Sequence, residues 1–150
     1  MIRTVLTFLA IAGCGDTVST PAAFPADYKA SYVQVRPCRS SSDHDLHHVR
    51  VLADPLGLDP YSMRNAPFPV GSVILKEEYD IGDSNCTGAL TDYTVMVKLA
   101  AGSSPATLDW HWQRVDSGRN VVSDDEPHCY TCHKMCGVPP DGYQGTCEVP

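Results

Sequence analysis

The chain has 150 residues, and its 18 acidic and 11 basic side chains give a formal net charge of −7. This length fits one domain, or one domain with a tail. The acidic balance disfavours nucleic acid as a partner, because proteins that bind nucleic acid usually carry a basic face. Twelve prolines and eleven glycines predict many turns, and seven cysteines indicate an oxidising compartment, metal or cofactor ligation, or both.

The N-terminal residues are typical of an export signal. Arg3 is followed by an apolar run over residues 5–11, far shorter than the ~20 residues that span a bilayer. Ile-Ala-Gly-Cys at residues 11–14 is similar to a bacterial lipobox, whose cysteine receives lipid. An ordinary cleaved signal, or a buried N-terminal strand, is the alternative. The expected organisation is a lipoprotein signal peptide over residues 1–13, a flexible tether starting at a lipidated Cys14 over residues 14–25, and a functional domain over residues 26–150.

On this interpretation the protein belongs to a bacterial cell envelope and faces the periplasm or the cell exterior. It meets the membrane through its lipid anchor only, without a transmembrane helix.

The rest of the chain alternates between short periodic segments and turns. The segment 27–35 is predicted to open with a short helix, because a proline and an aspartate stand near its start. Strands are predicted where apolar and polar residues alternate, over residues 48–53, 72–79, 93–99 and 110–115, and one or two helical turns fit residues 59–65. The expected fold class is α+β, mainly an antiparallel β-sheet of about four to five strands with short flanking helices.

Residues 129–133 form a C-x-x-C-H motif. Two thiols three residues apart can add to the two vinyl groups of one haem, and the adjacent histidine then reaches the iron. In an exported chain the motif predicts one covalent haem c per chain on a C-terminal haem-attachment helix, with Cys129 and Cys132 as tethers and His133 as the iron ligand. Three alternatives stay open: a thioredoxin-like redox pair, a zinc site that also uses Cys136, and a structural disulfide.

On this interpretation the number of remaining cysteines is even, so all of them can form disulfides. Removing Cys14 and the haem pair leaves 7 − 1 − 2 = 4 cysteines, which make two disulfides with three possible connectivities. We favour Cys136–Cys147 with Cys38–Cys86, because the first pair closes a local loop just after the haem motif. The even remainder also supports lipidation of Cys14.

The order of these segments resembles the cytochrome P-460 family and its relative cytochrome c′-beta, from about Pro25 to the C-terminus. The resemblance implies an antiparallel β domain that holds one five-coordinate haem. The residues that carry it are Pro25-x-x-Tyr28, Val49-Arg50-Val51 before Asp54-Pro55, Phe68-Pro69-x-Gly71-Ser72-Val73-x-x-Lys76-Glu77, Trp110 and the final C-x-x-C-H.

The resemblance also implies roles for two charged residues. Lys76 matches the lysine that hydroxylamine-oxidising members cross-link to the porphyrin, and Arg50 matches an arginine beside the distal haem face of some relatives. The alternative for Lys76 is a solvated lysine paired with Glu78, and for Arg50 a surface ion pair. The nominal candidates for a distal proton-accepting carboxylate are Glu77, Glu78 and Asp92.

Three functions are compatible with these residues. The first is an exported, lipid-anchored c-type haem protein that binds or oxidises hydroxylamine or nitric oxide, and so a haem-dependent oxidoreductase if it has a catalytic role. The second is a six-coordinate periplasmic electron-transfer cytochrome, whose sixth ligand is Met96, Met63 or one of His44, His47 and His48. The third is a non-haem, disulfide-stabilised binding lipoprotein. Besides a small nitrogen ligand or gas, we expect a periplasmic redox partner, and a homodimer stays open.

Overall fold

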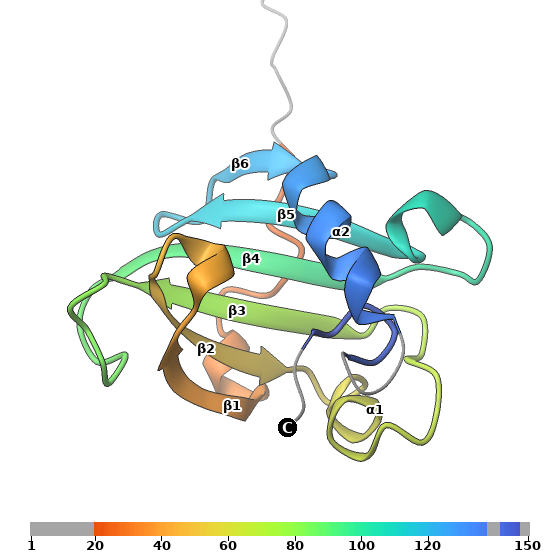
Figure 1. Ribbon diagram of the computed structural model, residues 1–150, viewed down its shortest axis with the longest axis horizontal. Coiled ribbons are helices and arrows are strands. Elements are labelled where there is room, and N and C mark those ends of the chain that lie inside the picture. Colours follow the sequence, from red (N-terminus) through yellow and green to blue (C-terminus); the bar gives the residue numbers. More distant parts are fainter. Residues whose placement is uncertain (1–19, 138–141, 148–150) are drawn as a thin grey trace, which may run out of the picture.

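The computed structural model describes residues 20–137 and 142–147, and the expected signal peptide and Cys14 lie outside these residues. Six antiparallel strands form one sheet in the order β1-β2-β3-β4-β5-β6, so each strand pairs with its neighbour in sequence (Figure 1). The strands are β1 (Val33–Ser40), β2 (His48–Ala53), β3 (Val73–Tyr79), β4 (Leu90–Lys98), β5 (Trp110–Asp116) and β6 (Val121–Asp124). The helices are α1 (Leu58–Met63) and α2 (Pro127–His133), with 3₁₀ turns η1 (Tyr28–Ala30), η2 (Ser42–His44), η3 (Pro105–Thr107) and η4 (Lys134–Cys136).

The α+β prediction is confirmed, with one or two strands more than expected. The four strands predicted from alternation correspond to β2, β3, β4 and β5. Strand β1 was missed because Pro37 interrupts its pattern and its pairing with β2 has two register shifts. The short helix predicted at the start of residues 27–35 is the 3₁₀ turn η1, and the chain continues as a strand from Val33 because it pairs there with β2. Strand β6 has only four residues.

Each face of the sheet carries its own buried cluster, because successive side chains of a strand point to opposite faces. The first cluster lies on the face covered by the N-terminal segment and consists of Phe24, Tyr28, Leu52, Val73, Leu75, Tyr93, Val95 and Val115. The second lies on the face crossed by α2 (Figure 1) and consists of Val51, Ala53, Tyr61, Phe68, Ile74, Met96, Trp110 and Trp112. The central strand β3 contributes to both clusters and is buried on both sides.

The packed domain begins before residue 26, which shortens the expected tether. Phe24 is buried with 4% exposure, and Ala22 and Ala23 pack against the first cluster. The Ala23 amide donates a 2.8 Å hydrogen bond to Gln113 Oε1 on β5. Residues 22–24 therefore pack against the sheet.

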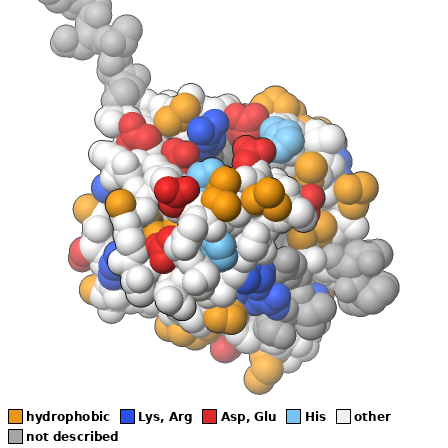
Figure 2. Space-filling model, turned by 60° about the vertical axis from the view of Figure 1, so that its left-hand side comes forward, with side chains coloured by type: hydrophobic (Ala, Val, Ile, Leu, Met, Phe, Trp, Pro, Cys, Tyr) orange, Lys and Arg blue, Asp and Glu red, His pale blue; other side chains and the backbone are white. Residues whose placement is uncertain are grey.

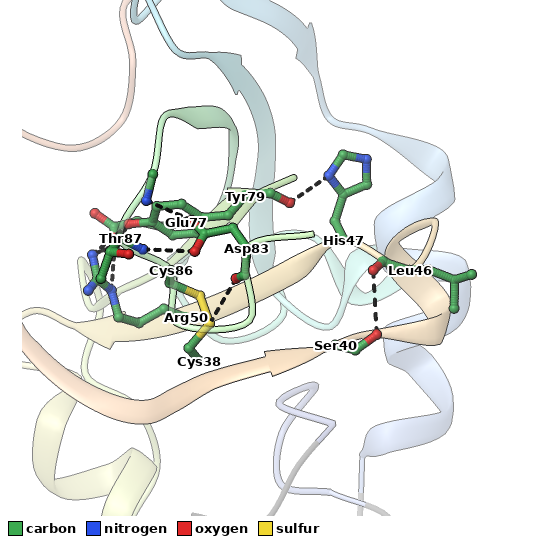
Figure 3. The surroundings of a disulfide bond; sticks show 11 residues. Cys38, Ser40, Leu46, His47, Arg50, Glu77, Tyr79, Asp83, Cys86 and Thr87 are labelled. Carbon is green, nitrogen blue, oxygen red and sulfur yellow. Dashed lines mark hydrogen bonds and ion pairs between the residues drawn. A yellow bond between two sulfur atoms is a disulfide. The ribbon is translucent and has the colours of Figure 1, made fainter. Parts of the chain in front are cut away.

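Both expected disulfides are present with the favoured connectivity. Cys38–Cys86 joins β1 to the loop between β3 and β4, as Figure 3 shows, and spans 48 residues. Cys136–Cys147 spans 11 residues and ties the C-terminal loop to η4. Within residues 20–137 and 142–147, no helix combines the length and the apolar character needed to cross a bilayer. The face shown in Figure 2 intermingles acidic, basic and hydrophobic side chains.

A buried charge network stands behind β3, on the face away from α2. Glu77 is fully buried and accepts hydrogen bonds from Arg50 Nε at 2.7 Å and from Tyr79 OH at 2.9 Å (Figure 3). It also accepts one from Tyr28 OH. Arg50 also donates to Tyr79 OH at 2.6 Å. Burial and the hydrogen bond to Glu77 raise the pKa of the Tyr28 hydroxyl, so it remains a donor. The network joins η1, β2 and β3.

We predict that Glu77→Gln destabilises the protein by about 3 kcal/mol, because removing one partner of a buried ion pair leaves the other charge uncompensated. Urea unfolding at neutral pH measures the change. The control is Asp92→Asn, which removes an exposed pair with Arg114 at 3.5 Å and should cost less than about 1 kcal/mol. Equal losses in the two variants would contradict a structural role for the Glu77 network.

Candidate functional site

The short helix α2 presents the C-x-x-C-H motif to one face of the sheet. Glu126 precedes it in an extended conformation and its side chain accepts a 3.2 Å hydrogen bond from the His128 amide, while Pro127 occupies the first helical position. Residues three and four positions apart lie on the same side of a helix. Cys129, Cys132 and His133 therefore face the same way, toward β5 and β4.

A cavity of about 350 Å³ lies between the sheet, α2 and the turn η2. The strands contribute an apolar floor that includes Val49, Val51, Ile74, Met96 and Trp112. Lys76, Thr94 and Arg39 add polar groups from three strands. The remaining lining residues are Ser41, Asp43, His44, Tyr61, His128, Cys129, Cys132, His133, Met135, Cys136, Thr146 and Cys147.

His133 is held in one orientation by two contacts. Its Nδ1 lies 2.5 Å from the Gly145 carbonyl oxygen, and its ring meets the Trp112 ring edge-on at 4.8 Å between centroids. Since a carbonyl only accepts hydrogen bonds, Nδ1 carries the hydrogen and Nε2 keeps the electron pair that binds a metal. Burial, with the charge of Lys76, lowers the pKa of His133 to about 4. The imidazole is therefore neutral at pH 7, as a metal ligand must be.

The two motif cysteines are free thiols. Burial, with the nearby carboxylate of Glu126, raises the pKa of Cys129 to about 11, whereas redox-active C-x-x-C thiols have lowered pKa values. The zinc alternative loses Cys136, which is bonded to Cys147. Within residues 20–137 and 142–147, no three His, Cys, Asp or Glu side chains converge as a metal site. The arrangement favours attachment of an organic group over redox or zinc chemistry.

A chain of hydrogen bonds starts at Lys76 in the cavity wall. Its Nζ lies 2.5 Å from His44 Nε2, and His44 Nδ1 lies 3.2 Å from Glu78 Oε1, which also accepts from Thr94 Oγ1 at 3.2 Å. Burial lowers the pKa of Lys76 to about 8 although Glu78 and Asp43 oppose the shift. Burial alone would raise the pKa of Glu78, but His44 and Lys76 lower it overall. The cavity therefore has a lysine amine close to its titration point, linked to a buried carboxylate.

The structure separates the other predicted residues. Arg50 does not line the cavity: it points to the opposite face of the sheet, where it binds Glu77. This places Arg50 away from a haem in the cavity, contrary to the role that the resemblance implied. The same alternation puts Glu77 out of reach, and Asp92 pairs with Arg114 at 3.5 Å. Of the nominal carboxylates, Glu78 alone is hydrogen-bonded to residues that line the cavity, among the residues described.

Only some of the possible sixth ligands of the iron line the cavity, among the residues described. Met96 lines the cavity, whereas Met63 on α1 is 67% exposed. The histidine cluster is dispersed: His44 enters the cavity, His47 Nδ1 lies 2.8 Å from the Tyr79 carbonyl oxygen (Figure 3), and His48 begins β2. The carbonyl oxygen of Gly145, which orients His133, was not predicted from the sequence. Every residue has a backbone carbonyl, so the residue type does not show which one makes this contact.

An antiparallel sheet thus faces a helix that carries two thiols and an imidazole across a cavity with a largely apolar floor. The cytochrome P460 family model matches residues 25–137, and the chain belongs to this family. Comparison with curated proteins gives no match. Family membership implies a haem cofactor. The residues present fit that group, because two thiols, a neutral imidazole and apolar side chains line one cavity together with the half-buried Lys76.

We predict that Lys76→Met stabilises the haem-free protein by about 1 to 3 kcal/mol at pH 7, because a partly buried, desolvated charge is replaced by an apolar side chain of similar size. The pKa of Lys76 is lowered from 10.5 to about 8 in the folded state, so the unfolded chain binds more protons between these values and wild-type stability rises with pH there. The gain in the variant should therefore shrink as the pH rises from 8 to 10. Urea unfolding measures it, with exposed Lys134→Met as the control. A loss of stability would make Lys76 a structural residue.

Proposed function

We propose that the protein is a c-type cytochrome in which Cys129 and Cys132 bind one haem through thioether bonds and His133 Nε2 binds the iron. The observation that carries this proposal is the position of His133, whose Nδ1 is engaged by the Gly145 carbonyl at 2.5 Å while the ring faces the same cavity as both thiols. A metal-binding histidine usually donates its other N–H to such a partner. The two free cysteines support the same conclusion, because the four other cysteines outside the N-terminal segment are paired.

We further propose that the cavity takes a small nitrogen ligand, hydroxylamine or nitric oxide. When bound, the haem supplies an iron that binds such a ligand and exchanges electrons. Lys76, His44 and Thr94 are among the polar residues that line the cavity, while Val49, Val51, Ile74, Met96 and Trp112 give its floor an apolar character. Lys76 can donate a hydrogen bond to the ligand, and His44 can pass a proton toward Glu78 through the 2.5 Å and 3.2 Å contacts. These groups favour oxidation of a protic ligand over gas binding alone.

The location of the protein remains as the sequence predicts it. We propose a lipid-anchored protein of the bacterial cell envelope with a periplasmic redox partner. Two disulfides support an oxidising compartment. The electron-transfer alternative has one observation in its favour, since the Met96 thioether lines the cavity and could complete a six-coordinate iron.

The first prediction concerns attachment. The full chain, expressed with a cytochrome c maturation system, should retain haem on a denaturing gel. Cys129→Ala/Cys132→Ala should lose the haem-dependent peroxidase stain completely, because both thioether bonds are gone. Cys38→Ser/Cys86→Ser, which removes as many sulfur atoms far from the motif, should keep it. A wild-type chain that is colourless after such expression would refute the proposal.

The second prediction concerns the open position on the iron. Nitric oxide should change the ferrous absorption spectrum of the wild-type protein. Hydroxylamine with an electron acceptor should give turnover that His44→Ala reduces about tenfold or more, the lower range for loss of a proton-transfer group. A low-spin spectrum that ignores nitric oxide, and that responds only after Met96→Leu, would instead establish the electron-transfer function.

A further inference from the structure

The C-terminal loop, residues 142–147, lies beyond the family match, which ends at residue 137. This loop nevertheless supplies a contact to the haem motif, because its Gly145 carbonyl oxygen lies 2.5 Å from His133 Nδ1. Thr146 and Cys147 also line the cavity on the side of α2. The loop therefore belongs to the proximal wall of the site, in a part of the chain that the family model does not cover.

The loop is fastened to both sides of the site. Cys147 is bonded to Cys136 on η4, and the Gly145 amide donates to the Cys136 carbonyl oxygen at 3.2 Å. On the sheet side, Trp110 Nε1 donates a 2.7 Å hydrogen bond to the Gln144 carbonyl oxygen. Tyr143 OH reaches the Ala66 carbonyl oxygen at 2.8 Å, beyond α1. These contacts come from three separate segments and fix the backbone on both sides of Gly145.

Two glycines allow this close approach. A Cβ on Gly142 would stand 2.6 Å from Cys136 Cβ and from the Thr146 carbonyl oxygen, and closer still to the Cys136 carbonyl oxygen. Gly145 has φ +89°, a conformation that L residues with side chains rarely adopt, and a Cβ there would lie 3.1 Å from Leu108 Cδ1. Gly142 thus lets the loop approach η4 more closely than a residue with a side chain could.

We propose that residues 142–147, closed by Cys136–Cys147, act as a proximal clamp: a positioning element that holds the Gly145 carbonyl on His133 Nδ1 and so sets the electron donation of the imidazole to the iron. A hydrogen bond at Nδ1 raises the basicity of Nε2 and fixes the ring orientation. A more basic proximal ligand stabilises ferric over ferrous iron and strengthens the iron–histidine bond. The proposal rests on the proposed function, in which His133 binds haem iron.

The competing role for the disulfide is general stabilisation. Both disulfides reduce the entropy of the unfolded chain, and the longer Cys38–Cys86 loop should do so more strongly. Only the clamp, however, connects a disulfide to the electronic state of His133. A spectroscopic readout at the iron therefore separates the two roles, with Cys38–Cys86 as the matched control.

The test compares Cys136→Ser/Cys147→Ser with Cys38→Ser/Cys86→Ser in the matured holoprotein. Removing the clamp disulfide should lower the ferrous iron–histidine stretching frequency in resonance Raman spectra and raise the haem reduction potential, since the hydrogen bond at Nδ1 weakens. Removing Cys38–Cys86 should leave both quantities at the wild-type values. Unchanged values in the clamp variant, or equal shifts in the two variants, would overturn the proposal.

A haem-free readout keeps the proposal separate from haem binding itself. In the wild-type apoprotein, ¹⁵N spectra should show His133 as the Nδ1–H tautomer, and opening of the loop in the clamp variant should speed exchange of that proton about tenfold. Gly142→Ala keeps every cysteine and should act in the same direction by pushing the loop off η4. If His133 of the apoprotein is the Nε2–H tautomer, the proposed clamp is refuted even if haem attaches. A haem-free matured protein with the Nδ1–H tautomer would sink the proposed function and leave the clamp geometry standing.

Discussion

The alternation of side chains along β3 is the constraint on which the site depends. Strand β3 is buried on both faces, and it places Lys76 in the cavity while the adjacent Glu77 points to the other side. A shift of one residue in register would exchange these two groups, leaving a carboxylate in the cavity and a lysine facing Arg50. The hydrogen bonds from Arg50, Tyr28 and Tyr79 to Glu77 make that shift costly. Arg50 thus acts on the cavity at a distance, by holding the register of the strand that carries Lys76.

Glu77 and Lys76, which are neighbours on β3, differ in how well their surroundings compensate their charges. Glu77 is met by a guanidinium and two hydroxyl donors, which satisfy a buried carboxylate. Lys76 is met by one imidazole nitrogen at 2.5 Å, and burial lowers its pKa to about 8. A well-paired charge that stabilises the fold and a poorly compensated one in a cavity lie side by side in sequence. Perturbed groups in cavities are characteristic of functional sites, which is why Lys76 and not Arg50 is assigned a role there.

The sequence predicted most of the sheet and the core of the site, for identifiable reasons. Regular alternation marks β2 to β5, and the C-x-x-C-H spacing places Cys129, Cys132 and His133 together on α2. Strand β1 was not predicted, because Pro37 interrupts its sequence pattern and its pairing with β2 contains two register shifts. The position of Arg50 could have been predicted from the alternation of β2, because its neighbours Val49 and Val51 face the cavity and Arg50 must point to the other side of the sheet. The position of His44 could not be predicted in this way, because His44 lies on the turn η2 and the place of that turn depends on how β1 and β2 pair.

A cavity inside a small domain has a mechanical consequence. About 350 Å³ between the sheet and its covering segments contains no side-chain packing to hold those segments in place. The Cys136–Cys147 disulfide lies at one of these segments. Cys136 ends η4, which follows α2, and its bond to Cys147 ties the C-terminal loop to this end of the helix. A covalent link thus supports a wall of the cavity that apolar packing on the cavity side does not. The two motif cysteines and the Cys136–Cys147 disulfide therefore border the same cavity.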